Sequence, residues 1–199
     1  MFFRDKLSSK NWETLGIKMK KVRGQILNIA QLGQPVLKQK AQLVEDILGE
    51  ECQNLIKDMM STVEEAGGVG IAAPQIYHSL RVFIMCSKPN TRYPDAPLMA
   101  PTAIINPEII AASEEIEKGW EGCLSVPSMR GLVPRHHAVT VKYHDVQGRE
   151  HESVFTGFIA RIFQHEIDHL DGLTFIDRLE SLEDLVSESY WYEHHAQGV

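Results

Sequence analysis

The sequence has few cysteines and no excess of positive charge, and both shortages exclude classes of protein. Three cysteines in 199 residues argue against a disulfide-stapled secreted scaffold and for a reducing compartment. Two of them, Cys52 and Cys86, lie in apolar segments and are expected to pack in the core.

Lys and Arg total 20 against 27 Asp and Glu, giving a formal net charge of −7. An acidic chain lacks the electrostatic footprint of a general nucleic-acid binder, so we expect no DNA partner.

Long apolar runs and internal repeats are also missing. No stretch approaches the roughly 18 apolar residues that a membrane-spanning helix needs, so no membrane partner is expected. Charged residues directly follow Phe2 and Phe3, where a secretory signal would have its apolar centre. We expect a cytoplasmic protein in preference to an organellar one. Residues 1–18 are expected to be a non-essential N-terminal extension, and residues 19–199 a single domain with a C-terminal helix.

Hydrophobic periodicity predicts a mixture of helices and strands. Residues 50–65 place apolar side chains three and four positions apart, which is typical of an amphipathic helix, and Gly67 and Gly68 end it. Segments rich in Val, Ile and Phe predict strands, and a Gly-containing turn between the last two predicts a hairpin. These expected strands are residues 81–86, 103–110, 138–144 and 150–155.

Residues 157–170 form the expected central helix. Thr156 precedes it at the N-cap position, and Gly172 follows it where a left-handed residue ends a helix. Ser181 and Asp184 resemble a capping box, and the apolar residues after Ser181 predict a C-terminal helix. Because strands and helices do not alternate, we expect an α+β fold of mostly antiparallel sheets around the central helix.

The central helix carries the clearest chemical motif of the chain. His165, Glu166 and His169 fit the pattern HExxH, in which one helical turn brings two imidazoles onto the same face. Both imidazoles can therefore bind one cation. Glu166 lies one position further round the helix, which suits a general base that activates water and later returns the proton.

A catalytic cation of this kind needs a third protein ligand and one open position. In the pattern HExxHxxGxxH the third ligand is a histidine, but Phe175 occupies that position. Glu188 and Glu193 have the spacing of a glutamate ligand, which would make the chain a zinc endopeptidase. Cys123, between turn-permitting neighbours, offers a thiolate instead. The spacing alone leaves these alternatives open.

Three ordered segments resemble the signature motifs of the peptide deformylases. They read GVGIAAPQ at residues 68–75, EGCLS at 121–125 and QHEIDHLDG at 164–172, within a resemblance that runs from about Ile26 to about Arg178. The family removes the formyl group from the N-terminal methionine of newly synthesised polypeptides and releases formate. The resemblance thus implies a deformylase-like fold and formyl-methionyl nascent chains as partners, with a transient contact to the ribosome. An inactive peptide-binding module is a further alternative.

The resemblance also implies a metal centre. Cys123, His165 and His169 correspond to the residues that hold one divalent metal ion, with ferrous iron expected in preference to zinc or another divalent ion. Glu166 corresponds to the residue that activates water. Glu121 is expected either to accept a hydrogen bond from a ligand or to be a strand-end charge.

Substrate contacts are implied by the first two motifs and by one face of the helix. Gln75, through its side-chain amide, and Leu124, through its backbone N–H, are expected to donate to the oxyanion of the reaction. The backbone of Val69 and Gly70 is expected to pair with the substrate main chain. Side chains one and two turns before His165 are expected to line an apolar methionine pocket; they are Phe158, Arg161 and Ile162.

Overall fold

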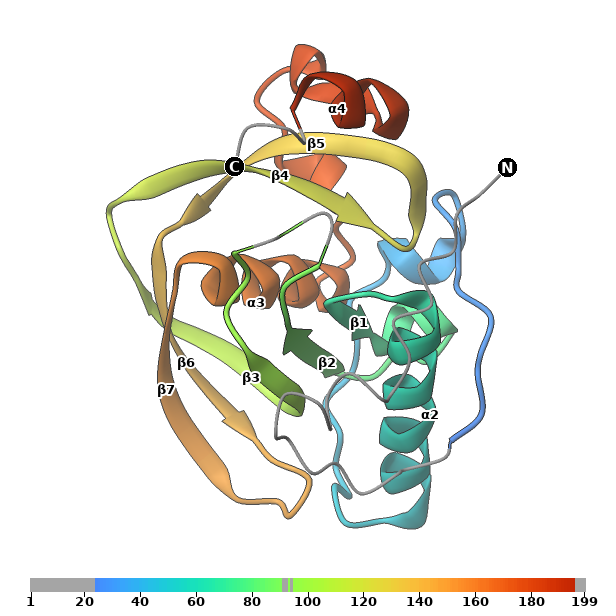
Figure 1. Cartoon of the computed structure of the whole chain (residues 1–199). Coiled ribbons are helices and arrows are strands. Elements are labelled where there is room, and N and C mark those ends of the chain that lie inside the picture. The colour runs from blue at the N-terminus through green and yellow to red at the C-terminus, as the bar shows by residue number, and fades with distance from the viewer. Residues whose placement is uncertain (1–23, 91–92, 94, 196–199) are drawn as a thin grey trace.

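The computed structural model of the chain describes residues 24–90, 93 and 95–195 (Figure 1). The expected N-terminal extension, residues 1–18, lies outside the described residues. The described elements, in chain order, are η1 (Pro35–Lys38), α2 (Glu50–Ala66), β1 (Gly70–Ala72), η2 (Ala73–Ile76), β2 (Val82–Ser87), β3 (Met99–Ala112), β4 (Ile116–Cys123), β5 (Val126–His136), β6 (Ala138–His144), β7 (Glu150–Thr156), α3 (Gly157–Leu170), η3 (Phe175–Arg178), η4 (Leu182–Asp184), β8 (Leu185–Ser187) and α4 (Glu188–His194).

Two sheets build the fold. The larger has five strands in the order β1-β2-β3-β6-β7, and the smaller has three in the order β4-β5-β8. Neighbouring strands in both sheets run antiparallel. The predicted α+β fold with mostly antiparallel sheets is therefore confirmed.

Helix α3 occupies the centre of the molecule, with β4 and β5 passing over it in Figure 1. Its apolar face packs on the five-stranded sheet, where the fully buried Phe163 meets Phe83 edge to face with ring centres 5.2 Å apart. Gln164 ties the helix to the end of β5, because its amide accepts from the backbone N–H of His136 and donates to the His136 carbonyl. Burial and these bonds together set the position of α3 between the two sheets.

Helix α2 covers a second part of the five-stranded sheet. Its apolar stripe, which includes Met59 and Val63, packs against β1, β2 and β3. The helix ends at Gly67, whose φ of 64° is a left-handed conformation that glycine adopts without strain. Cys52 is buried in this core and Cys86 is buried on β2. Both cysteines are core thiols, as predicted.

Two details of the predicted helix ends need correction. Thr156 is the N-cap residue of α3, but its side chain makes no capping hydrogen bond. The side-chain oxygen of Ser181 accepts from the N–H of Glu183 and not from that of Asp184. Gly172 has the expected left-handed φ, at 77°.

The C-terminal segment is divided where one helix was predicted. A 3-10 turn is followed by strand β8, and the helix α4 begins only at Glu188. Strand β8 pairs with residues Met129 to Gly131 of β5. Backbone pairing with a distant strand thus overrides the local helical pattern. None of the helices in the described part of the chain is long and apolar enough to cross a membrane.

The packing of α3 predicts a large stability cost for shortening Phe163. We expect Phe163→Ala to lower the free energy of unfolding by about 3–5 kcal/mol, because the change removes a fully buried aromatic ring and leaves a cavity. Urea-induced unfolding measures the loss. Val154→Ala is the control, since Val154 is 65% exposed. Equal midpoints for the two variants would contradict this account of the core.

Candidate active site

Three potential metal ligands converge where α3 meets the end of β4. The ligand atoms of Cys123, His165 and His169 all lie within 4.8 Å of one another. The two histidines are one helical turn apart on α3, and the Cys123 Sγ lies 3.2 Å from the Nε2 of His169. Neither Glu188 nor Glu193, the alternative ligands by spacing, belongs to this cluster among the described residues.

The cysteine is surrounded by groups that favour its thiolate. Burial acts to raise the pKa of the Cys123 thiol, but His169 and His165 outweigh burial and bring the pKa well below its usual value. The backbone N–H of Ser125 and the side-chain amide of Gln75 also donate to the sulfur, at 3.3 and 3.4 Å. A thiolate is the form of cysteine that binds metals, so the residues present fit a divalent cation.

A buried carboxylate supports His165, the second of these potential ligands. Glu121, which is 4% exposed, contacts the Nδ1 of His165 at 2.9 Å through its Oε2. Burial raises the pKa of this carboxyl, but Arg135 and His165 reverse the effect and hold the pKa below its usual value. Arg135 donates to both oxygens of Glu121, and Arg161 donates to Oε1. Because Nδ1 of His165 is engaged, its Nε2 remains for a metal.

A second layer of charges lies behind this carboxylate, and sequence reasoning missed it. Arg135 also donates to Asp168 at 2.6 Å, and Arg178 pairs with the same carboxylate. Asp168 is one of the unspecified residues inside the HExxH motif, and it is 3% exposed. Its only signal in the sequence is an acidic residue on the buried side of a helix, which requires a partner.

Glu166 is enclosed beside the potential ligands. It is 3% exposed, and burial, acting against the neighbouring His165 and His169, raises the pKa of its carboxyl to about 7. Its Oε2 is buried without a hydrogen-bond partner among the described residues. Gly70 on β1 provides the space for this side chain, because a Cβ at that position would overlap the Glu166 carboxylate. The carboxyl is therefore held in place by sterics and is available for proton transfer.

The two expected oxyanion donors lie beside Cys123. The Oε1 of Gln75 accepts from the backbone N–H of Ala72 at 2.8 Å, and its Nε2 donates to the hydroxyl of Ser125 at 3.1 Å. These bonds set the orientation of the amide. Leu124 occupies the turn between β4 and β5, and its N–H takes part in none of the hydrogen bonds found within the described residues.

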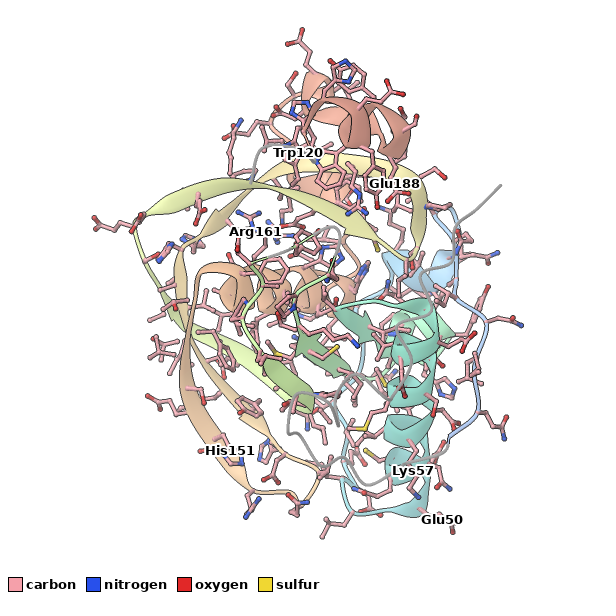
Figure 2. The ribbon with its side chains drawn as sticks, in the orientation of Figure 1. Glu50, Lys57, Trp120, His151, Arg161 and Glu188 are labelled. Atoms are coloured by element: carbon pink, nitrogen blue, oxygen red, sulfur yellow. The ribbon has the colours of Figure 1, made fainter. Side chains whose placement is uncertain are left out.

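A cavity of about 310 Å³ opens beside these groups. Every expected site residue lines it except His169, which is fully buried. Figure 2 shows Arg161 on α3, and Trp120 and Glu188 near the junction of α4 with the smaller sheet. Sequence reasoning missed several lining residues that come from the loop before β3 and from the smaller sheet: Tyr93, Trp120, Met129 and Arg130. Glu188 of α4, which the spacing offered only as a metal ligand, also lines the cavity.

Most of the chain matches a known protein family, and the geometry of the site agrees with that match. Residues 26–184 match the family model described as Polypeptide deformylase. The chain belongs to this family. Its members remove the N-formyl group from formyl-methionyl polypeptides, so the protein is a metal-dependent hydrolase that acts in protein biosynthesis. The cysteine and histidine cluster is consistent with that metal dependence.

Named relatives and solved structures agree with the assignment. The chain is 55% identical over 169 residues to peptide deformylase 2 of Nostoc sp.. The matched residues cover 85% of this chain and 94% of that protein. The Met-Ala-Ser-bound class I type b peptide deformylase of Acinetobacter baumannii is 47% identical, with a TM-score of 0.77 over 79% of this chain and 100% of that one. The peptide deformylase of Thermotoga maritima is 36% identical, with a TM-score of 0.71 over 79% and 99% of the two chains.

The family membership decides between the functions that the sequence left open. A zinc endopeptidase with Glu188 or Glu193 as a ligand was one alternative, and an inactive peptide-binding module was another. The deformylase match, together with a cluster built on Cys123, favours neither of them. Deformylation, the leading expectation, is confirmed.

The contact of Gly70 with Glu166 predicts a steric effect on activity. We expect Gly70→Ala to lower kcat/KM for a formyl-methionyl peptide by about 100-fold, because the new methyl group displaces the carboxyl by the order of an ångström. Steady-state kinetics of formate release provide the measurement. Gly67→Ala is the control: it strains a left-handed residue at the end of α2 and should lower stability but not kcat/KM. Similar activities of both variants would contradict the steric argument.

Proposed function

We propose that the cavity beside α3 is the deformylation site and that Cys123, His165 and His169 hold one divalent metal ion. The observation that carries the proposal is the convergence of one sulfur and two imidazoles within 4.8 Å beside a cavity. A thiolate and two neutral imidazoles are an established ligand set for zinc and for other divalent first-row metals. Three protein ligands also leave a position open for the reaction.

Proton transfer is assigned to Glu166. Cys123, His165 and His169 would hold a divalent cation, which would supply a lowered pKa of water and a polarised formyl carbonyl. Glu166 takes up the proton that the attacking water loses, and it delivers a proton to the amine nitrogen as the bond between the formyl carbon and that nitrogen breaks. Burial raises the pKa of this carboxyl, which suits a group that must both accept and return a proton. The products are formate and a free amino terminus.

Stabilisation of the negative charge that develops on the formyl oxygen is assigned to two hydrogen-bond donors. The Gln75 amide is already oriented by Ala72 and lies against Cys123. The N–H of Leu124 follows Cys123 directly in the chain. Donors that are positioned before the reaction need no reorganisation, and each can contribute roughly 3–4 kcal/mol to the stability of the transition state.

Substrate binding is assigned to β1 and to the first half of α3. Strand β1 is at the edge of the five-stranded sheet, so the backbone at Val69 and Gly70 can pair with a peptide as an added strand, which binds many sequences. Phe158, Arg161 and Ile162 line the cavity one and two turns before His165 and form the methionine pocket. Arg161 lines this pocket, and its guanidinium bonds to Glu121 and to backbone carbonyls of the smaller sheet.

The biological setting follows from the substrate and from the relatives. The named relatives are bacterial, and we assign the protein to the bacterial cytoplasm, where nascent formyl-methionyl chains arise. A transient contact with the ribosome follows from such a substrate. Residues 19–199 act as one catalytic domain, with residues 1–18 as a non-essential extension.

Two substitutions test the assigned chemistry. We expect Glu166→Ala to lower kcat for a formyl-methionyl peptide by about 100- to 10 000-fold, because general acid and base catalysis is lost. Cys123→Ser should abolish turnover, because the thiolate ligand is removed. Formate release measures both effects. Cys52→Ser and Glu65→Ala, at positions outside the cluster and the cavity, are the matched controls. Near-native turnover by either site variant would overturn the proposal.

We assign ferrous iron as the metal of this site. Protein purified without air should contain about one iron per chain, because the three residues form a single site. Exposure to air should lower the activity as iron is oxidised. Metal analysis and activity on the same sample provide the test. A zinc-containing sample with equal or higher activity would contradict the iron assignment while leaving the ligand assignment intact.

A further inference from the structure

Arg130 is a charged side chain enclosed in the wall of the cavity. It lies on β5 and is 3% exposed. Its guanidinium lies against the backbone of Gly122, since a Cβ at Gly122 would overlap the Nη1 of the arginine. Gly122 directly precedes Cys123, so the arginine occupies space beside the assigned ligand.

Groups from α4 hold the guanidinium from its other side. The Nη2 of Arg130 donates to the Oε1 of Glu188 at 2.5 Å, and the guanidinium carbon lies 5.1 Å from the centre of the Trp191 ring. Glu188 and Trp191 are three positions apart, so they share one face of the helix. Both follow residue 184, where the match to the family model ends. The sequence beyond the family match therefore supplies part of the cavity wall.

The placement of Arg130 depends on the charge of Glu188. A guanidinium this deeply buried is stable only when its charge is compensated. Glu188 is the carboxylate that pairs with Arg130 among the described residues, and the Nε of Arg130 has no hydrogen-bond partner there. The remaining side-chain bond of the guanidinium is a long one, from Nη1 to the hydroxyl of Tyr93 at 3.4 Å. Without the carboxylate, the guanidinium has little to keep it against Gly122.

We propose that Glu188 is a positioning residue for the substrate cavity, acting through Arg130, with Trp191 as the surface on which the guanidinium rests. The inference rests on the proposed function, in which this cavity receives the formyl-methionyl peptide. Neither Glu188 nor Arg130 has a hydrogen bond to Glu166 or Gln75 among the described residues. Their effect is therefore on peptide binding and not on the chemical step.

Steady-state kinetics with N-formyl-Met-Ala-Ser test this role. We expect Glu188→Gln to raise KM about tenfold with kcat changed less than about twofold, the pattern of lost binding that is uniform along the reaction. Glu188→Asp keeps the charge and should recover part of the lost affinity. Glu193→Gln is the matched control, because Glu193 is exposed on the same helix and does not line the cavity. It should leave KM and kcat unchanged.

A double-mutant cycle then tests whether Glu188 acts through Arg130. In an Arg130→Met background, Glu188→Gln should have no further effect on KM, because residues that act as one unit are not additive. If Arg130→Met does not fold, the series of Glu188 and Glu193 variants decides alone. Thermal unfolding of each variant identifies a change that is merely structural.

Several outcomes would overturn the positioning role. They are equal kinetics for Glu188→Gln and Glu193→Gln, a KM for Glu188→Asp as high as that for Glu188→Gln, a fall in kcat at constant KM, and full additivity in the cycle. Glu166→Ala, measured in the same assay, separates this result from a failure of the proposed function. Retained activity in Glu166→Ala would contradict the proposed deformylation site. Lost activity in Glu166→Ala, together with unchanged kinetics in Glu188→Gln, would contradict only the inference about α4.

Discussion

The active site depends on one buried carboxylate. Glu121, on β4, contacts His165 and accepts hydrogen bonds from Arg135 and Arg161, so it is surrounded by donors on both oxygens. Such a charge is stable in the interior only when it is fully paired. The same pairing fixes the positions of its partner side chains. His165 and Arg161 are one turn apart on α3. The same carboxylate therefore orients an assigned metal ligand, holds a residue of the assigned methionine pocket and joins α3 to the smaller sheet.

Elements of the fold with strong local signals could be predicted from the sequence. The central helix over residues 157–170 and the strand over 138–144 match α3 and β6 at both ends. Apolar periodicity, a turn and a terminal glycine define such elements within a few residues of chain. Strand β8 could not be predicted, because its residues have a helical pattern and form a strand only by pairing with β5. Strand β1 was also missed, since it has three residues, too few for periodicity to show.

The site was predictable to the extent that its motifs are local. His165, Glu166 and His169 follow from one helical turn, but spacing did not choose between Cys123 and a C-terminal glutamate. The resemblance to a family made that choice, and the structure brings Cys123 to the histidines. The supporting charges, such as Arg135, could not be found in this way. Each becomes meaningful only when the fold places it against a partner distant in sequence.

X-ray absorption spectroscopy of protein purified without air, at the absorption edge of its bound metal, is the most direct test of the central claim. If Glu121 and its arginines prepare a site of one thiolate and two imidazoles, the spectrum should show one sulfur and two imidazole nitrogens around the metal. The sulfur should disappear in Cys123→Ser. A metal surrounded only by oxygen and nitrogen in the unaltered protein would contradict the account, because Cys123 would then not be a ligand.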